Sequence, residues 1–263
     1  MDYLSLFETA ADAVQDAVRP LVGTRAGGEN LAMGADGTPT KRIDQVAEDA
    51  CLRVFREEEF GGVLISEEIG EVRLGDGDDT IFLDPVDGTF NAITGIPFYA
   101  ISLAFSENDT IREGYVRNLA TGETFTAREG QGARCDDDPI RTSGVSLLEE
   151  CAMSIYGRKF DPATVIHLGR KIRRFRLLGA SALELCYVAS GRLDGFIDVR
   201  GTLRVIDAVA GVLIAREAGG QVTDLEGTAF RFPRTVTMGK SLVATNGMVH
   251  GKVVEYLREG ALL

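Results

Sequence analysis

The sequence has few of the residues that build thiolate or imidazole metal sites. Its 263 residues include only two histidines, His167 and His250, which excludes a His-rich zinc centre. The four cysteines have no paired spacing and predict buried reduced thiols, not a disulfide framework or a thiolate zinc site: Cys51, Cys135, Cys151 and Cys186. The motif Gly-x-Ser-x-Gly is missing, so a serine hydrolase has little support.

Long apolar runs and basic residues are also scarce. No stretch reaches the length that spans a membrane, and the acidic N-terminal segment 2–16 is unlike a signal or transit peptide. Because 28 Lys and Arg face 40 Asp and Glu, the net charge is −12, which disfavours a nucleic-acid surface. The negative electrostatic field of such a protein would repel a phosphate substrate unless bound metal ions changed it locally. We therefore expect a cytoplasmic protein without nucleic-acid or membrane partners.

The segment Ile-Phe-Leu-Asp-Pro-Val-Asp-Gly-Thr at 81–89 is the most informative in the chain. It predicts a strand that ends at Asp84, followed by a turn that the proline and glycine enforce. Asp84, Asp87 and the carbonyl group of Val86 would then face one side and offer hard oxygen ligands to a divalent metal. Taken alone, the motif is equally compatible with a plain surface turn.

Other acidic residues change that balance. Glu67 follows the apolar run 63–65, and Asp207 opens an apolar helix, where it is either a functional carboxylate or an ordinary helix-start acid. Asp44 lies near the start of another helix, where a solvated helix face is the alternative. The acidic runs 76–79 and 135–138 are expected to be solvated turns.

Periodicity predicts a mixed α and β chain. An amphipathic helix from Tyr3 to about Val22 precedes a glycine-rich loop at 25–40, expected to be mobile, and a second helix from Arg42 to about Glu59. Strand patterns follow up to residue 128, and the first element predicted beyond residue 144 is a strand at 175–178. We expect an N-terminal α+β half, 1–140, with most metal ligands, and a C-terminal α/β half, 141–263, with Asp207.

Five blocks, taken together, resemble the inositol monophosphatase and fructose bisphosphatase superfamily of metal-dependent, lithium-sensitive phosphatases. They occur in family order: Thr-Lys-Arg-Ile-Asp at 40–44, Ile-Ser-Glu-Glu-Ile-Gly at 65–70, Asp-Pro-Val-Asp-Gly-Thr at 84–89, Gly-Ala-Ser at 179–181 and Val-Ile-Asp-Ala-Val-Ala-Gly at 205–211. The local sequence is most similar to the archaeal-type branch with dual fructose-1,6-bisphosphatase and inositol-1-monophosphatase activity. The resemblance implies an α/β (α+β) fold, a layered α-β-α-β-α sandwich of the sugar phosphatase type.

The resemblance also implies a metal centre. One Mg²⁺ would be held by Glu67, Asp84 and the Val86 carbonyl, and a second by Asp84, Asp87 and Asp207. A third, weaker ion would be shared by Glu67 and waters under the 27–40 loop, and Mn²⁺ is a possible substitute.

Further implied roles concern catalysis. Asp44 and Thr89 match the pair that orients and deprotonates the attacking water, and Glu67 acts with them. The expected reaction is in-line hydrolysis of fructose 1,6-bisphosphate and inositol 1-phosphate.

The substrate contacts are expected from backbone groups and arginines. The N–H groups of Gly88 and Thr89 would bind the phosphate, and Asp87 and Ser181 are expected as further substrate contacts. A bisphosphate needs a second anion site, for which Arg176 and Arg200 are the first candidates, with Arg174, Arg158 and Tyr156 nearby. A solvated basic helix end is the alternative for 170–174.

Other functions stay open. They are a 3′-phosphoadenosine nucleotidase, an NADP phosphatase, and a non-catalytic, transcription-linked interaction protein. The absence of tryptophan and an aromatic content of 7% weigh lightly against an adenine site. The resemblance also implies a homodimer.

Overall fold

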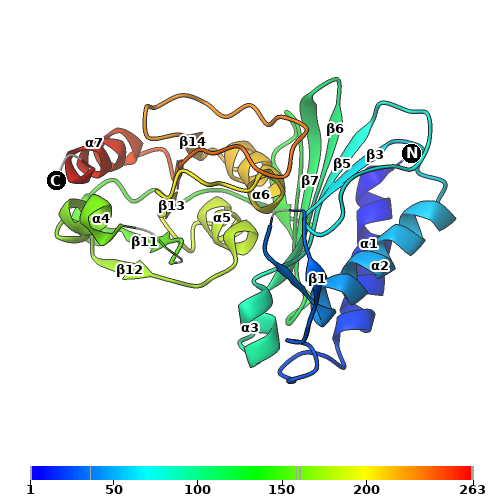
Figure 1. The fold of residues 1–263 in the computed structure, drawn as a ribbon. Coiled ribbons are helices and arrows are strands. Elements are labelled where there is room, and N and C mark those ends of the chain that lie inside the picture. The colour runs from blue at the N-terminus through cyan, green and yellow to red at the C-terminus, as the bar shows by residue number, and fades with distance from the viewer. Residues whose placement is uncertain (1, 36, 158, 160, 262–263) are drawn as a thin grey trace.

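The computed structural model, which describes residues 2–35, 37–157, 159 and 161–261, consists of alternating layers of helices and sheets (Figure 1). Helices α1 (Tyr3–Val18) and α2 (Arg42–Glu57) form one outer layer against an eight-stranded sheet. Helices α5 (Ser181–Ala189) and α6 (Val205–Glu217) lie between this sheet and a five-stranded sheet. Helices α4 (Pro162–Gly169) and α7 (His250–Gly260) form the other outer layer, so the predicted α-β-α-β-α sandwich is confirmed.

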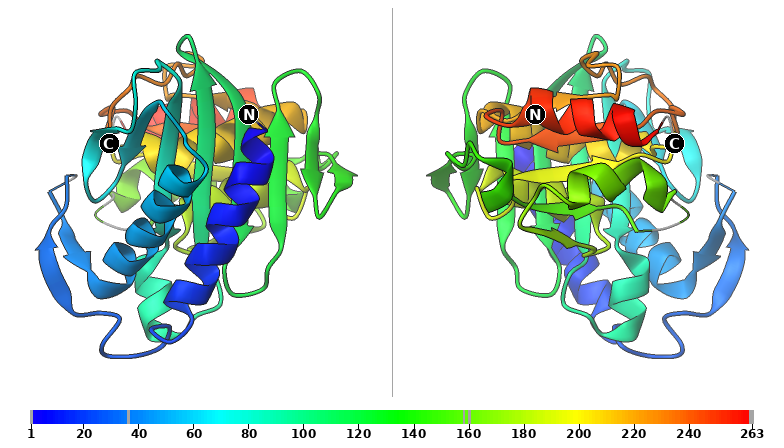
Figure 2. Two further views of the ribbon diagram at one scale, coloured as in Figure 1. Left: turned by 90° about the vertical axis from the view of Figure 1, so that its right-hand side faces the viewer. Right: turned by 90° about the vertical axis from the view of Figure 1, so that its left-hand side faces the viewer.

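The eight-stranded sheet has the order β10-β9-β8-β7-β6-β5-β3-β4, and α1 and α2 run across its outer face (Figure 2). Its strands are β3 (Val63–Ser66), β4 (Gly70–Arg73), β5 (Thr80–Asp87), β6 (Ala100–Glu107), β7 (Thr110–Asn118), β8 (Thr124–Arg128), β9 (Ala133–Cys135) and β10 (Asp138–Ile140). β3 pairs with β5 in parallel, whereas the other neighbours are antiparallel. The carboxyl ends of β3 and β5 therefore lie at the same edge of the sheet.

The five-stranded sheet has the order β12-β11-β13-β15-β14. Its strands are β11 (Ala152–Ile155), β12 (Arg174–Arg176), β13 (Gly195–Asp198), β14 (Gln221–Thr223) and β15 (Leu242–Thr245). The sequence prediction missed β11 and α4. The start of α4 is fixed by one local contact, in which the Asp161 carboxylate accepts a hydrogen bond from the N–H of Ala163.

The glycine-rich segment 25–40, expected to be a loop, holds an antiparallel hairpin of β1 (Asn30–Met33) and β2 (Pro39–Lys41). The N–H of Ala35 donates to the carbonyl oxygen of Glu68 at 2.9 Å, and the Thr40 hydroxyl donates to the Glu68 carboxylate. The prediction of a loop is wrong for β1 and β2, because these contacts with the segment after β3 give the hairpin a partner, and the expected mobility stays a prediction. Two further short helices complete the fold, α3 (Thr89–Thr94) and the 3₁₀ turn η1 (Leu148–Glu150).

Buried apolar residues of both halves share one cluster, in which Phe82 of β5 and Phe196 of β13 pack with helices α5 and α6. The first sheet ends at Ile140 and the second begins at Ala152, on either side of the expected division near residue 140. The status of 1–140 and 141–263 as domains stays a prediction. None of the described helices is long and apolar enough to cross a membrane.

Candidate active site

The end of β5 differs from the predicted turn after Asp84. The strand continues to Asp87, but Asp84 pairs with Ser102 and Asp87 with Ala100, so β5 carries one extra residue in a β-bulge. Proline is tolerated there because a bulge leaves one residue outside the ladder. The bulge re-aims both carboxylates, which an uninterrupted strand would place on opposite faces.

The chain turns at Gly88 instead, where φ is +88°. A Cβ atom at this position would lie 3.0 Å from the Cβ of Ala180 and 3.1 Å from the carbonyl oxygen of Phe98. Glycine is therefore required both by the backbone conformation and by the close approach of the segment before α5. This approach brings Ser181, the first residue of α5, to the side of the site where α3 begins.

Three carboxylates converge from different elements. Glu67 directly follows β3, Asp84 belongs to β5, and Asp207 lies in the first turn of α6. Each offers an oxygen, and these oxygens all lie within 4.8 Å of one another, while the residues are 8%, 0% and 2% exposed. Asp87 is also buried, and its carboxylate accepts a hydrogen bond of 2.7 Å from the N–H of Ala182 in α5.

The electrostatics of this cluster favour a bound cation. Burial and the negative charge of Asp207 raise the pKa of both Asp84 and Asp87 well above the ordinary value, and burial raises the pKa of Asp207. Among the described residues, Asp84 Oδ2 and Asp207 Oδ1 are buried and no other group donates to them, so these two oxygens can hydrogen-bond only to each other, by sharing a proton. Hard, oxygen-only donors of this kind fit Mg²⁺, Mn²⁺ or Ca²⁺.

A hydroxyl–carboxylate pair lies next to these oxygens. The Thr89 Oγ1 atom is 3.0 Å from Asp44 Oδ1 and 3.1 Å from the carbonyl oxygen of Val86, so its proton can be donated to either. The N–H of Lys41 donates to Asp44 Oδ2 at 3.1 Å and fixes the carboxylate at the start of α2. Burial, followed by the charge of Glu68, raises the pKa of Asp44 to about 7, a value suited to a general base near neutral pH.

The arginines that the sequence predicts to bind substrate have different surroundings in the structure. The Arg200 guanidinium pairs with both oxygens of Asp198, at 2.9 and 2.6 Å, and stacks 3.5 Å from the ring centroid of Tyr156. The side chains of Arg174 and Arg176 are exposed, and Arg176 donates to the carbonyl oxygen of Phe175. Arg158 lies outside the described residues. The substrate roles of these arginines stay predictions.

The sequence analysis missed Arg204 as a residue of the site. Its Nε donates to Asp207 Oδ2 at 2.8 Å, and its Nη1 donates to Glu67 Oε1. The spacing of three residues between Arg204 and Asp207 could have predicted the first contact. No local pattern predicts the second, because Glu67 is 137 positions away.

Glu48 was also missed. It is fully buried on α2, and its Oε1 accepts hydrogen bonds from the Ser66 hydroxyl and, at 3.3 Å, from the N–H of Ile69. These residues flank Glu67, so Glu48 holds the segment that carries this carboxylate. Acidic residues on a helix usually face solvent, which is why the pattern of α2 gave no signal.

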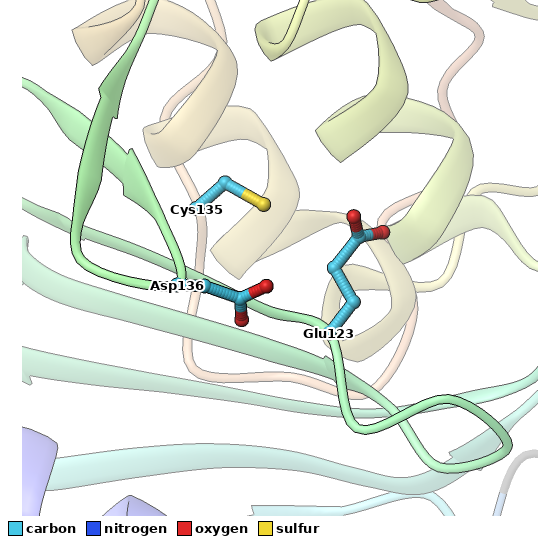
Figure 3. A group of neighbouring side chains, drawn as sticks. All are labelled: Glu123, Cys135 and Asp136. Carbon is cyan, nitrogen blue, oxygen red and sulfur yellow. The ribbon is translucent and has the colours of Figure 1, made fainter.

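A second group of candidate ligands consists of Glu123, Cys135 and Asp136 (Figure 3). These residues lie in or next to β8 and β9, near the edge of the eight-stranded sheet that is opposite β3. Both Glu123 oxygens accept from Arg192, at 2.7 and 2.5 Å, and Asp136 Oδ1 accepts from the N–H of Thr124 at 2.9 Å. Burial and the charge of Glu123 raise the pKa of the Cys135 thiol to about 11, which keeps it protonated at neutral pH. These contacts define a structural group around the β9–β10 turn.

The cysteine prediction needs one correction. All four thiols are free, and Cys51, Cys151 and Cys186 are buried, but Cys135 is only half-buried. It lies on an edge hairpin, where neither layer of helices covers it completely.

The chain belongs to the inositol monophosphatase family, whose pattern it matches over residues 3–261. It is 43% identical to the fructose-1,6-bisphosphatase/inositol-1-monophosphatase of Methanothermobacter thermautotrophicus, over 94% of this chain and 93% of that protein. It is also 38% identical to the bifunctional NADP phosphatase/NAD kinase of Methanococcus maripaludis, where 97% of this chain spans 49% of the longer protein.

Solved structures agree with this assignment. The IMPase of Thermotoga maritima superposes with a TM-score of 0.86 at 30% identity, covering 100% of this chain and 99% of that one. The predicted resemblance to the superfamily and to its archaeal dual-activity branch is confirmed by these relatives. The family is one of metal-dependent phosphatases, so the chain is a phosphatase that acts on small-molecule phosphates.

Proposed function

We propose that this protein is a Mg²⁺-dependent phosphomonoesterase that hydrolyses fructose 1,6-bisphosphate and inositol 1-phosphate. The observation that carries the proposal is the convergence of Glu67, Asp84 and Asp207, with two buried oxygens that receive no hydrogen bond from any other group among the described residues. Such oxygens are costly to bury unless a cation or donor contacts them. The 43% identical relative, named for these two activities, supports the choice of substrates.

The proposed metal ligands are those expected from the sequence. Glu67, Asp84 and the Val86 carbonyl would hold one ion, and Asp84, Asp87 and Asp207 a second. When bound, Mg²⁺ supplies charge neutralisation, a lowered pKa of the attacking water and stabilisation of the leaving oxygen.

The protein groups would then position the reactants. Thr89 Oγ1 accepts a hydrogen bond from the attacking water while it donates to Asp44 Oδ1, its contact at 3.0 Å. As the water attacks, its proton would pass to Thr89 Oγ1 while Thr89 passes its own proton to Asp44, which thereby acts as the base. The N–H groups of Gly88 and Thr89 hold the phosphate for in-line attack, so no covalent phosphoenzyme forms.

The rest of the substrate would contact the start of α5 and the second sheet. Ser181 would bind the sugar or inositol hydroxyls, and Arg176 would bind the distant phosphate of a bisphosphate. Because Asp198 already pairs with the Arg200 guanidinium, Arg200 would orient the sugar more than it would bind a full phosphate charge.

NADP phosphatase activity is the second candidate. The Methanococcus maripaludis relative at 38% identity and one in Methanocaldococcus jannaschii at 35% identity are both named bifunctional NADP phosphatase/NAD kinase. The 2′-phosphate of NADP is also a monoester, so the same metal centre and the same Asp44–Thr89 pair would serve it. Only the contacts with the alcohol would differ.

The test measures phosphate release from fructose 1,6-bisphosphate, inositol 1-phosphate, NADP and adenosine 3′,5′-bisphosphate, each with Mg²⁺ and with chelator. An Asp207→Asn variant purified in parallel detects contaminating phosphatases. Chelator-sensitive release from the first two substrates, lost in the variant, is the expected result. Release from a nucleotide alone would retain the metal chemistry and replace the substrate. A lack of release from every ester would favour a non-catalytic interaction protein.

We further propose that two or three ions bind, that Mn²⁺ can replace Mg²⁺, and that the protein is a cytoplasmic homodimer. Metal titration with elemental analysis tests the first two statements. Sedimentation of the purified protein tests the assembly, and fractionation of cells tests the location.

A further inference from the structure

The guanidinium of Arg204 lies among the proposed metal ligands. Its Nε donates to Asp207 Oδ2 at 2.8 Å, and its Nη1 contacts Glu67 Oε1, so one cation joins β3 to α6. The Arg204 side chain is 21% exposed, compared with 2% for Asp207. The ion pair is therefore partly buried, a setting in which such contacts are stronger than at the surface.

The backbone of Arg204 is held firmly by the segment 236–240. Arg204 bridges to Thr237, and the neighbouring N–H groups of Leu203 and Val205 donate to the segment 236–240, at 3.1 and 2.7 Å. A long side chain on a fixed backbone can change partners by rotation about its side-chain bonds, without any movement of α6.

Glu67 and Asp207 cannot serve both cations in the same way. The Arg204 guanidinium donates to one oxygen of Glu67 and one of Asp207, and a divalent ion would need these same two carboxylates as ligands. A divalent ion and a guanidinium at this place would also repel each other strongly at low dielectric.

We propose that Arg204 is an internal competitor for the metal centre. Its guanidinium neutralises Glu67 and Asp207 and competes for these carboxylates with the divalent cations that each of them would hold. Arg204 thus raises the cation concentration that the site requires and stabilises the cluster when cations are scarce. The inference rests on the proposed cation site but not on the choice of substrate.

The test compares Arg204→Met and Arg204→Gln with the unaltered chain by two measurements that do not involve turnover. Calorimetric titration with Mg²⁺ and with Mn²⁺ gives the dissociation constant, and thermal unfolding in chelator and in saturating Mg²⁺ gives the stability. Arg192→Gln is the matched control. It removes the same charge from an arginine outside the site, whose guanidinium pairs with both oxygens of Glu123.

Competition predicts opposite changes in the two measurements. Both Arg204 variants should bind the cations at least about tenfold more tightly, because each loses the two charge-assisted hydrogen bonds to Asp207 and Glu67. They should also unfold at a lower temperature in chelator and gain more from Mg²⁺ than the unaltered chain. Cation binding by the variants but not by the unaltered chain would support the proposal as well.

Four outcomes would overturn the proposal. Unchanged affinity would mean that Arg204 does not compete, and weaker binding would mean that it assists; both would leave the cation site itself intact. A lack of cation binding in the variants and the unaltered chain would refute the cation site together with the competition. An equal tightening in Arg192→Gln would assign the effect to net charge.

Discussion

Replacement of Asp84 by asparagine should abolish activity and yet stabilise the protein in chelator. Asp84 is fully buried, and its Oδ1 accepts from the N–H of Val86 at 3.1 Å, a contact that an asparagine oxygen can keep. Among the described residues, the Oδ2 atom receives no hydrogen bond from any group other than Asp207. An amide nitrogen in its place could donate to Asp207 and would remove one of the repelling charges.

The size of the expected change in stability follows from these contacts. One gained hydrogen bond and one lost buried charge should stabilise the fold by about 1–2 kcal/mol in chelator. For a chain of this length that is a rise in melting temperature of roughly 2–6 °C. Turnover should fall by about 10³-fold or more, because metal stabilisation of the transition state is worth several kcal/mol.

The assay pairs thermal unfolding in chelator and in Mg²⁺ with phosphate release. Asp194→Asn is the matched control, since Asp194 is also buried but accepts from Ser143 and from the N–H of Ala152, at 2.5 and 2.7 Å. This control should be destabilised in both buffers and should keep its cation response. A lower melting temperature of Asp84→Asn in chelator, or a near-normal rate, would refute the reasoning.

Three further predictions concern other parts of the molecule. Gly88→Ala should lower the free energy of unfolding by about 2–3 kcal/mol in urea titrations, because it adds a Cβ at φ +88° against Ala180; a loss below 0.5 kcal/mol would contradict this. Arg176→Ala should reduce kcat/KM for fructose 1,6-bisphosphate by about tenfold while leaving inositol 1-phosphate nearly unaffected, and equal losses would exclude a role with a second phosphate. Burial lowers the pKa of His250 from 6.5 to about 4. Between these two pH values the unfolded chain binds a proton that the folded chain does not, so the free energy of unfolding should fall by about 2 kcal/mol as the pH is lowered from 6.5 to about 4. Unfolding curves at several pH values should show a weaker pH dependence in His250→Gln than in the control His167→Gln.

Much of the fold could be predicted because local patterns and tertiary packing agree. The helix predicted from Arg42 to about Glu59 is α2 (Arg42–Glu57), and the helix predicted to open at Asp207 is α6, which begins two residues earlier. The β1–β2 hairpin could not be predicted, since its partner Glu68 lies outside the glycine-rich segment. The bulge after Asp84 was hidden for a related reason, because its register is set by β6 and not by Pro85.

Some residues of the acidic site can be identified from the sequence, whereas others are recognised only from the folded structure. Asp84, Asp87 and Asp207 stand out because carboxylates interrupt apolar segments, and burial of such groups has no use unless something neutralises them. The group that neutralises two of the site's carboxylates, the guanidinium of Arg204, has no comparable signature in the sequence. Arg204 precedes α6 like any polar residue at a helix start, and only the packing of α6 against the eight-stranded sheet brings its guanidinium to Glu67. If only the acidic residues of the site are counted, metal ions must supply all of the compensating positive charge. With Arg204 included, the protein itself supplies one positive charge, and the cations must displace it from two of their own ligands.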